Sequence, residues 1–286
     1  MTTKLVLHNG DCLEVMATFE DNSVDIVICD LPYGRFEHLD YWDRCIDLER
    51  MWKQLWRICK PRTPIFLFGD FLFANILLNS QPKHFKFETV WNKGITTTPL
   101  LSKKRPGKAV EYILAFYKKQ PVYNIEKYHT KTYNPTQDKR LNENIYEGKI
   151  DEEEILKNRK YNGKGGKQYE PTLPINFIKD KPYEEGVIVS RPDFNGKKYE
   201  PTLPINIIEC PVKRLKKTIK AVTEKPQHIL EHLLKYWSNE GDVCLDFTMG
   251  SGSCGVACHN LNRKFIGIEM HKPHFDAAEK RLNSLE

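Results

Sequence analysis

Residues Val243–Ala257 read VCLDFTMGSGSCGVA. The stretch reads as a short apolar strand that ends at Asp246, then a tight turn, then the first residues of a helix. The turn and the helix start satisfy the pattern G-x-G-x-x-G, with glycines at Gly250, Gly252 and Gly255. A glycine turn between a strand and a helix lets a nucleotide-like ligand approach the backbone closely. The stretch therefore predicts an α/β sheet with a ligand at the carboxyl ends of its strands.

The acid at the end of this strand selects between ligands. Beside a pyrophosphate, the Asp246 carboxylate would face a like charge, whereas an ammonium group or a ribose hydroxyl binds well there. S-adenosylmethionine offers both groups and carries no phosphate. Glu269 ends the next predicted strand and is a second acid that suits a ribose. A nicotinamide-dependent oxidoreductase is the alternative that the glycine pattern alone leaves open.

A second strand end carries an unusual turn. The apolar run Val24–Cys29 leads into Asp30-Leu31-Pro32-Tyr33-Gly34. Taken alone, this is also an ordinary turn sequence in which an acid caps the next turn, and that structural interpretation stays open. The carboxyl ends of parallel strands share one edge of a sheet, however, so we expect this turn and the glycine loop to form one site.

In this order, the motifs resemble those of the amino-group DNA methyltransferases. Asp30-Leu31-Pro32-Tyr33 resembles the family's D-P-P-Y motif, and DFTMGSGS resembles its F-x-G-x-G cofactor loop. The first motif precedes the second across a long insertion, which is the order of the permuted β subgroup. Further segments resemble the family at residues 9–16, 90–119, 223–233 and 262–270. Leu31 in place of the first proline and Phe247-Thr248-Met249 in place of Pro-Phe-x depart from the pattern.

The resemblance implies an activity and a set of site residues. Asp30 and the Leu31 carbonyl would accept the two N–H groups of an exocyclic amine, Pro32 would fix the turn, and Tyr33 would stack on the base. An aspartate at the first position favours adenine N6, with cytosine N4 as the alternative. The implied cofactor is S-adenosyl-L-methionine, and its implied contacts are Asp11, Cys12, Asp30, Lys225, Asp246, Phe247, Thr248, Gly250, Gly252, Ser253 and Glu269.

The implied partner is DNA, whose target base must be flipped out of the duplex. Two basic clusters suit phosphate contacts, although a solvated surface explains either of them equally well. The candidates for DNA binding are Lys103, Lys104, Arg105 and Lys108, and the second cluster is Lys213, Arg214, Lys216, Lys217 and Lys220. An RNA methyltransferase and a non-catalytic DNA-binding protein are the other classes that remain. A homodimer and a cognate restriction endonuclease are left open.

The fold class that we expect is α/β: a Rossmann-like methyltransferase sheet with helices on both faces, permuted in sequence. We divide the chain into a catalytic half at 1–120, a target-recognition insertion at 121–222, and a cofactor-binding half at 223–286. The insertion contains a duplication with a period of 30, in which KQYEPTLPINFI begins at Lys167 and KKYEPTLPINII at Lys197. Predicted strands are Leu5–Leu7, Val24–Cys29, Pro64–Phe68, Phe87–Trp91, Glu111–Tyr117, Asp242–Phe247 and Lys264–Glu269. Predicted helices are Asp47–Cys59, Phe71–Leu78, Pro226–Trp237, Ser253–Asn262 and Pro273–Leu285.

Composition sets limits on location and on metal binding. The net charge of +6 over 286 residues is mild, and no apolar run approaches the roughly 18–20 residues of a membrane span. The start MTTKLVLHNGD lacks the apolar stretch of a signal peptide, so we expect a cytoplasmic protein with reduced thiols and no membrane partner. The eight cysteines form no C-x-x-C pair. Cys254, Cys258 and His259 share one predicted helix as a candidate metal trio, but we favour small buried residues there and expect no metal.

Overall fold

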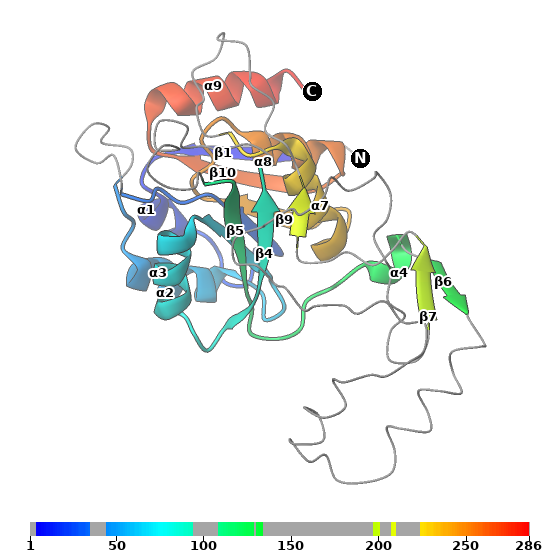
Figure 1. Ribbon diagram of the computed structural model, residues 1–286. Coiled ribbons are helices and arrows are strands. Elements are labelled where there is room, and N and C mark those ends of the chain that lie inside the picture. The colour runs from blue at the N-terminus through cyan, green and yellow to red at the C-terminus, as the bar shows by residue number, and fades with distance from the viewer. Residues whose placement is uncertain are drawn as a thin grey trace. The chain divides into compact units, whose positions relative to one another are not determined.

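The computed structural model describes residues 4–34, 44–93, 108–128, 130–133, 197–200, 207–209 and 224–285. By its internal contacts the chain divides into two units, one of Met1–Asn124 with Ile205–Glu286 and one of Ile125–Pro204. The larger unit is built on an eight-stranded sheet with the order β1-β10-β9-β2-β3-β5-β4-β8 (Figure 1). In that order the strands are Leu5–Asn9, Lys264–Glu269, Val243–Asp246, Ile26–Cys29, Ile65–Gly69, Val110–Phe116, Phe85–Asn92 and Ile207–Glu209.

The sheet is mostly parallel, as the alternation of strands and helices predicts. β1, β10, β9, β2 and β3 are parallel neighbours, whereas β5 runs antiparallel to both β3 and β4. The N-terminal and C-terminal segments meet where β2 pairs with β9, with Ile26 opposite Cys244 and Val27 opposite Leu245. This pairing merges the two α/β stretches into one sheet, and the expected Rossmann-like fold class is confirmed.

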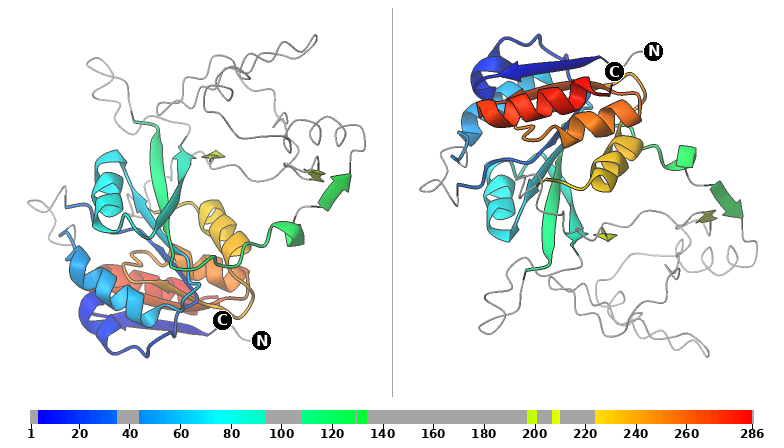
Figure 2. Two further views of the ribbon diagram at one scale, coloured as in Figure 1. Left: turned by 90° about the horizontal axis from the view of Figure 1, so that it is seen from below. Right: turned by 90° about the horizontal axis from the view of Figure 1, so that it is seen from above.

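Helices cover both faces of the sheet (Figure 2). α1 (Cys12–Ala17), α2 (Leu48–Ile58) and α3 (Phe71–Ser80) contribute to one apolar core, and α7 (Gln227–Trp237), α8 (Ser253–Asn260) and α9 (Lys272–Asn283) to the other. Successive side chains of a strand point to opposite faces. In β2, Val27 and Cys29 therefore join the first core, while Ile26 and Ile28 join the second. All four are at most 1% exposed, which is why this strand reads as a continuous apolar run.

α1 is not among the predicted helices, and its start is fixed by a side-chain cap. Asp11 begins this helix as its N-cap, because its Oδ1 accepts hydrogen bonds from the backbone N–H groups of Leu13, at 2.8 Å, and Glu14, at 3.2 Å. A helix of six residues is too short to show a helical period in the sequence.

A buried arginine fixes the end of α7. Arg263, 2% exposed, donates from Nε to Ser238 Oγ at 3.0 Å and from NH2 to the backbone carbonyls of Ser238, at 2.8 Å, and Leu234, at 3.3 Å. The last carbonyls of a helix have no partner within the helix, and a cation is favourable beside them. Arg263 thus anchors α7, whose other end follows Lys225.

The smaller unit contributes α4 (Ile125–Tyr128) and a two-stranded antiparallel sheet of β6 (Thr130–Tyr133) and β7 (Lys197–Glu200). β7 opens the second copy of the sequence duplication. The end of the same copy supplies β8, which pairs in parallel with β4 and belongs to the larger unit. The first copy and the basic cluster at 213–220 lie outside the described residues. Among the helices of the described ranges, none has the length and apolar character to cross a membrane.

Candidate active site

Four neighbouring parallel strands end in acids along one edge of the sheet. Glu269 is the last residue of β10 and Asp246 the last residue of β9, while Asp30 directly follows β2 and Asp11 lies two residues beyond β1. The carboxyl edge of an open α/β sheet is where such folds bind their ligands. The structure therefore gathers the predicted site acids at one edge, as expected from the two motifs.

The D-L-P-Y turn and the glycine loop are joined directly. Thr248 Oγ1 donates a hydrogen bond to the backbone carbonyl of Asp30 at 2.9 Å, and Cys29 Sγ lies 2.9 Å from the same hydroxyl. The backbone N–H of Thr248 donates to Asp246 Oδ1 at 3.2 Å. Thr248 stands where the sequence departs from the family pattern, and its hydroxyl is the group that connects the two motifs.

Both carboxylate oxygens of Asp30 are engaged. Tyr33 donates its hydroxyl to Oδ1 at 3.0 Å, and the Lys225 ammonium contacts Oδ2 in an ion pair. Burial raises the pKa of the Asp30 carboxyl, and the charge of Glu111 adds to this rise, whereas Lys225 and the Tyr33 hydroxyl oppose it. The Tyr33 ring stacks on Phe73 with centroids 4.7 Å apart.

Lys225 lies among three carboxylates. Its Nζ contacts Asp30, lies 3.9 Å from Glu111 Oε2, and is only 10% exposed. Burial lowers the pKa of Lys225, but the charges of Asp30, Glu111 and Asp246 outweigh burial and leave the pKa above its ordinary value. Lys225 is therefore a buried positive charge beside the D-L-P-Y turn.

The glycine loop is held from the next strand. Glu269 Oε2 accepts from the backbone N–H of Gly250 at 3.0 Å, and Oε1 accepts from that of His271 at 2.7 Å. Gly250 and Gly252 have φ of +50° and +77°, a region that favours glycine, and Gly252 is the N-cap of α8. Apart from Gly250 and its two chain neighbours, the part of the chain that the structure describes has no heavy atom within 4 Å of the position that a Cβ would take there, which leaves space for a ligand.

Asp246 is 7% exposed at the base of this loop. Burial raises the pKa of its carboxyl to about 7, with further increases from the charges of Asp30 and Glu269. A carboxyl group shifted this far is typical of a functional site.

Other predicted residues lie around this centre. Cys12 is 8% exposed and burial raises the pKa of its thiol to about 12. Phe247 is buried in the core, Leu31 is 3% exposed, and Pro32 is half-buried. Lys108 forms an ion pair with Asp70 at 3.0 Å. Lys103, Lys104 and Arg105 lie outside the described residues.

Sequence reasoning missed three charged residues of the site. Glu224 Oε1 accepts from Ser253 Oγ at 2.7 Å and from Arg281 NH1 at 2.6 Å, and Arg281 NH1 also donates to the carbonyl of Ser251 at 3.2 Å. These contacts tie α9 and the segment before α7 to the glycine loop. The third residue, Glu111, lies in β5. A charged residue inside the apolar run VEYILAF is the signal that could have identified it.

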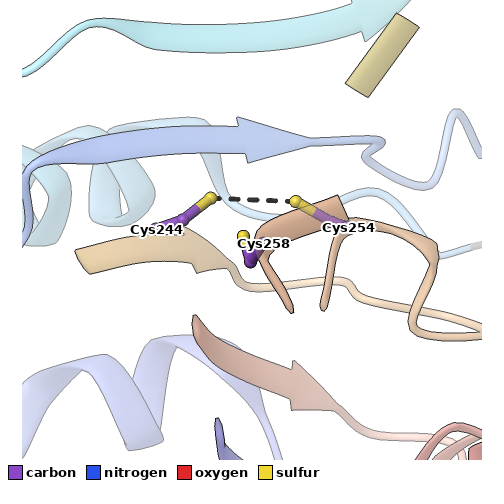
Figure 3. Close-up of side chains that lie close together, drawn as sticks. All are labelled: Cys244, Cys254 and Cys258. Atoms are coloured by element: carbon purple, nitrogen blue, oxygen red, sulfur yellow. Dashed lines mark hydrogen bonds between the residues drawn. The ribbon is translucent and has the colours of Figure 1, made fainter. Parts of the chain in front are cut away.

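Three cysteines converge beneath the glycine loop (Figure 3). The ligand atoms of Cys244 on β9 and of Cys254 and Cys258 on α8 all lie within 4.8 Å of one another, and the first two sulfurs are 3.7 Å apart. Burial is the main reason that the pKa values of Cys244 and Cys258 lie well above the ordinary thiol value, and the hydrogen bond with Cys244 has the same effect on Cys254. The group thus includes Cys244 rather than the predicted His259, because β9 packs against α8. All three side chains are buried in the second apolar core.

Comparison with known proteins agrees with this geometry. A family model, N6_N4_Mtase, described as DNA methylase, matches residues 24–280. The Type II methyltransferase M2.LlaDCHI of Lactococcus lactis subsp. cremoris is 46% identical over 61 residues, which are 21% of this chain and 23% of that protein. The Type II methyltransferase M.HpaI of Haemophilus parainfluenzae is 42% identical over 62 residues, 22% of this chain and 20% of that protein. The aligned stretch thus spans less than a quarter of either relative.

Solved structures share the fold along nearly the whole chain. The M1.HpyAVI–SAM complex has a TM-score of 0.56 at 21% identity and covers 98% of this chain and 99% of its own. The PvuII cytosine-N4-specific DNA methyltransferase has a TM-score of 0.60 at 14% identity, with 100% and 92% covered. At these identities the likeness is one of fold, whereas the family model covers most of the sequence. The chain therefore belongs to the DNA methylase family that this model describes.

Proposed function

We propose that this protein is an S-adenosyl-L-methionine-dependent DNA methyltransferase of the permuted β subgroup that methylates the exocyclic N6 amine of adenine. The observation that carries the proposal is the junction of its two motifs. Thr248 of the glycine loop is bonded to the carbonyl of Asp30, 218 residues away in sequence. A methyl donor on the loop and an amine at the D-L-P-Y turn would therefore lie side by side.

The chemistry of the edge suits this cofactor. The carboxylates of Asp11, Asp246 and Glu269 favour a cationic group and ribose hydroxyls, and they would repel a pyrophosphate. Glu269 already accepts two backbone N–H groups, yet a carboxylate has about four lone-pair sites and retains capacity for hydroxyls. The open space at Gly250 allows a ligand to approach the backbone. These features also argue against the nicotinamide alternative.

In the proposed mechanism, the turn prepares a poor nucleophile. The lone pair of an exocyclic amine is delocalised into the ring. Asp30 and the Leu31 carbonyl would accept one N–H each, which favours a pyramidal nitrogen whose lone pair points to the methyl group. S-adenosyl-L-methionine, when bound, supplies that methyl on a sulfonium and leaves as a neutral thioether. As the new carbon–nitrogen bond forms, the amine loses one proton, which Asp30 or water accepts.

Asp30 at the first motif position supports adenine over cytosine. The N4 amine of cytosine presents two N–H groups to the same acceptors and is the second candidate. In either case the base must leave the duplex, because its amine is out of reach inside the stack. Lysine and arginine contacts to phosphates would then offset the free energy needed to flip the base, and we propose the segment at 103–108 as their location.

The test is a methylation assay with product identification. The purified chain is incubated with S-adenosyl-L-methionine labelled in the methyl group and with unmethylated genomic DNA, and the DNA is digested to nucleosides. We expect label in N6-methyl-2′-deoxyadenosine. Asp30→Ala should abolish it, and Asp21→Ala, which removes a carboxylate that is 67% exposed, should leave it unchanged.

The other outcomes correct specific parts of the proposal. Label in N4-methylcytosine would overturn the base assignment and keep the mechanism. Label on RNA in a parallel reaction, with none on DNA, would overturn DNA as the substrate. An Asp30→Ala variant with full activity would refute the role of the D-L-P-Y turn.

A further inference from the structure

Glu111 is an acid inside the apolar strand β5, and its side chain is only 14% exposed. Its Oε1 accepts a hydrogen bond from Lys93 Nζ at 2.6 Å. Its Oε2 is buried and has no hydrogen-bond partner within the described ranges, but it lies 3.9 Å from the ammonium of Lys225. A buried carboxylate oxygen without a donor is costly, so this arrangement calls for a functional explanation.

Asp30 presents the complementary problem. Methyl transfer as proposed requires a carboxylate oxygen that accepts the N–H of the target amine. In this structure Tyr33 bonds to one oxygen and Lys225 to the other. Each oxygen has a second lone-pair site, but an amine that used the one on Oδ2 would place its N–H beside the Lys225 ammonium, and two donors repel each other. Lys225 is buried and carries its charge, so it cannot simply lose its partner, because an unpaired buried charge is strongly unfavourable.

We propose that Glu111 is a positioning residue that holds Lys225 when the target amine takes its place on Asp30. Shortening the Nζ–Oε2 separation from 3.9 Å to a hydrogen bond of about 2.9 Å requires a movement of only about 1 Å. The movement exchanges one ion pair for another, so the pocket keeps its net charge. It also satisfies the orphaned oxygen of Glu111 and frees Oδ2 of Asp30.

The geometry limits how far Lys225 can travel. Its ammonium lies 5.3 Å from the centroid of the Phe68 ring, so a weak cation–π interaction holds it on that side. Lys93 holds the other oxygen of Glu111 and so fixes the carboxylate in place. Lys225 thus has two acceptors, Asp30 before the amine binds and Glu111 afterwards.

This inference rests on the proposed methyl transfer, and its test uses the full chain under single-turnover conditions with saturating cofactor and DNA. Glu111→Gln keeps the shape and removes the charge that would hold Lys225. We expect the methyl-transfer rate to fall between about tenfold and about a hundredfold, as for other losses of positioning. The dissociation constants for S-adenosyl-L-methionine and DNA should change less than about twofold. The matched control is Glu279→Gln, which removes the charge of an exposed glutamate on α9 and should keep the full rate.

A double-mutant cycle separates positioning from a structural role. If Glu111 acts through Lys225, then Glu111→Gln causes no additional loss of rate in a Lys225→Met background. Glu111→Asp keeps the charge and should recover part of the rate, which also provides a test if Glu111→Gln folds poorly. Multiplicative losses in the cycle, or a full rate in Glu111→Gln, would overturn the inference. Absence of methyl transfer by the unmodified chain would instead refute the proposed function itself.

Discussion

Asp246 should cost the protein stability at neutral and alkaline pH. It is 7% exposed, and burial raises the pKa of its carboxyl from the ordinary value of 3.8 to about 7. The folded state therefore binds the proton more tightly than the unfolded state does. The free energy of unfolding contributed by this group is highest below pH 4 and falls as the pH rises to about 7.

The size of the effect follows from the shift. One pKa unit corresponds to about 1.4 kcal/mol, so a rise from 3.8 to about 7 corresponds to about 4 kcal/mol. Asp246→Asn removes the ionisation and keeps an oxygen that can accept the N–H of Thr248, now at 3.2 Å from Oδ1. The variant should match the unmodified protein near pH 4 and exceed its free energy of unfolding by up to about 4 kcal/mol at pH 8.

Urea unfolding, followed by circular dichroism from pH 4 to pH 8, measures this difference. Asp21→Asn removes one exposed carboxylate and controls for the change in net charge. A difference that stays constant across the pH range would refute the reasoning, because burial would then not hold the carboxyl protonated. If the proposed function holds, Asp246→Asn should also bind S-adenosyl-L-methionine less tightly, because the variant lacks an acid that is proposed to contact the cofactor. A residue that serves a binding site is often unfavourable for folding, which explains why the same change should raise stability.

Two further substitutions test the loop and the anchor of α7. In Gly252→Ala the backbone has a φ of +77°, and the new Cβ would lie only 3.2 Å from the Cβ of Ala278. In Gly241→Ala the φ is +83°, but the new Cβ would have no heavy atom within 4 Å among the described residues beyond its chain neighbours. Gly241→Ala should cost about 1 kcal/mol of unfolding free energy and Gly252→Ala clearly more, and equal losses in urea unfolding would contradict the packing argument. Arg263→Met leaves buried carbonyls at the end of α7 without a donor and should cost about 3 kcal/mol. Lys264→Met, at an exposed neighbour, should cost little, and a similar loss there would contradict the anchoring role.

Local patterns predicted the elements that position the site. Lys264–Glu269 is predicted and observed as β10. A short apolar run with turn residues on both sides identifies a buried strand from local sequence alone. The positive φ values at Gly250 and Gly252 likewise follow from residue type, since glycine adopts them without steric cost. α1 escaped prediction because six residues are too few for a period.

Local sequence patterns did not predict which residues from different strands and helices come into contact. The candidate trio, which we disfavour as a metal site, took its members from one helix, whereas the cysteine group in the structure contains Cys244 from β9 and not His259. Helical periodicity identifies neighbours within one element only. Which strand lies beneath that helix depends on the pairing of β9 with β10 and β2.

The two motifs, their placement at strand ends and the acids that they carry can be read from the amino-acid sequence, because turn chemistry and strand patterning are local. The contacts of those acids depend on how distant segments pair in the folded chain. The ion pair of Asp30 with Lys225 spans 195 residues, and the hydrogen bond from Thr248 to Asp30 spans 218. Both follow from the pairing of β9 with β2, which brings two distant segments to the same edge of the sheet. The position of Glu111 beside Lys225 follows from the antiparallel pairing of β5 with β3 and cannot be read from any window of the chain.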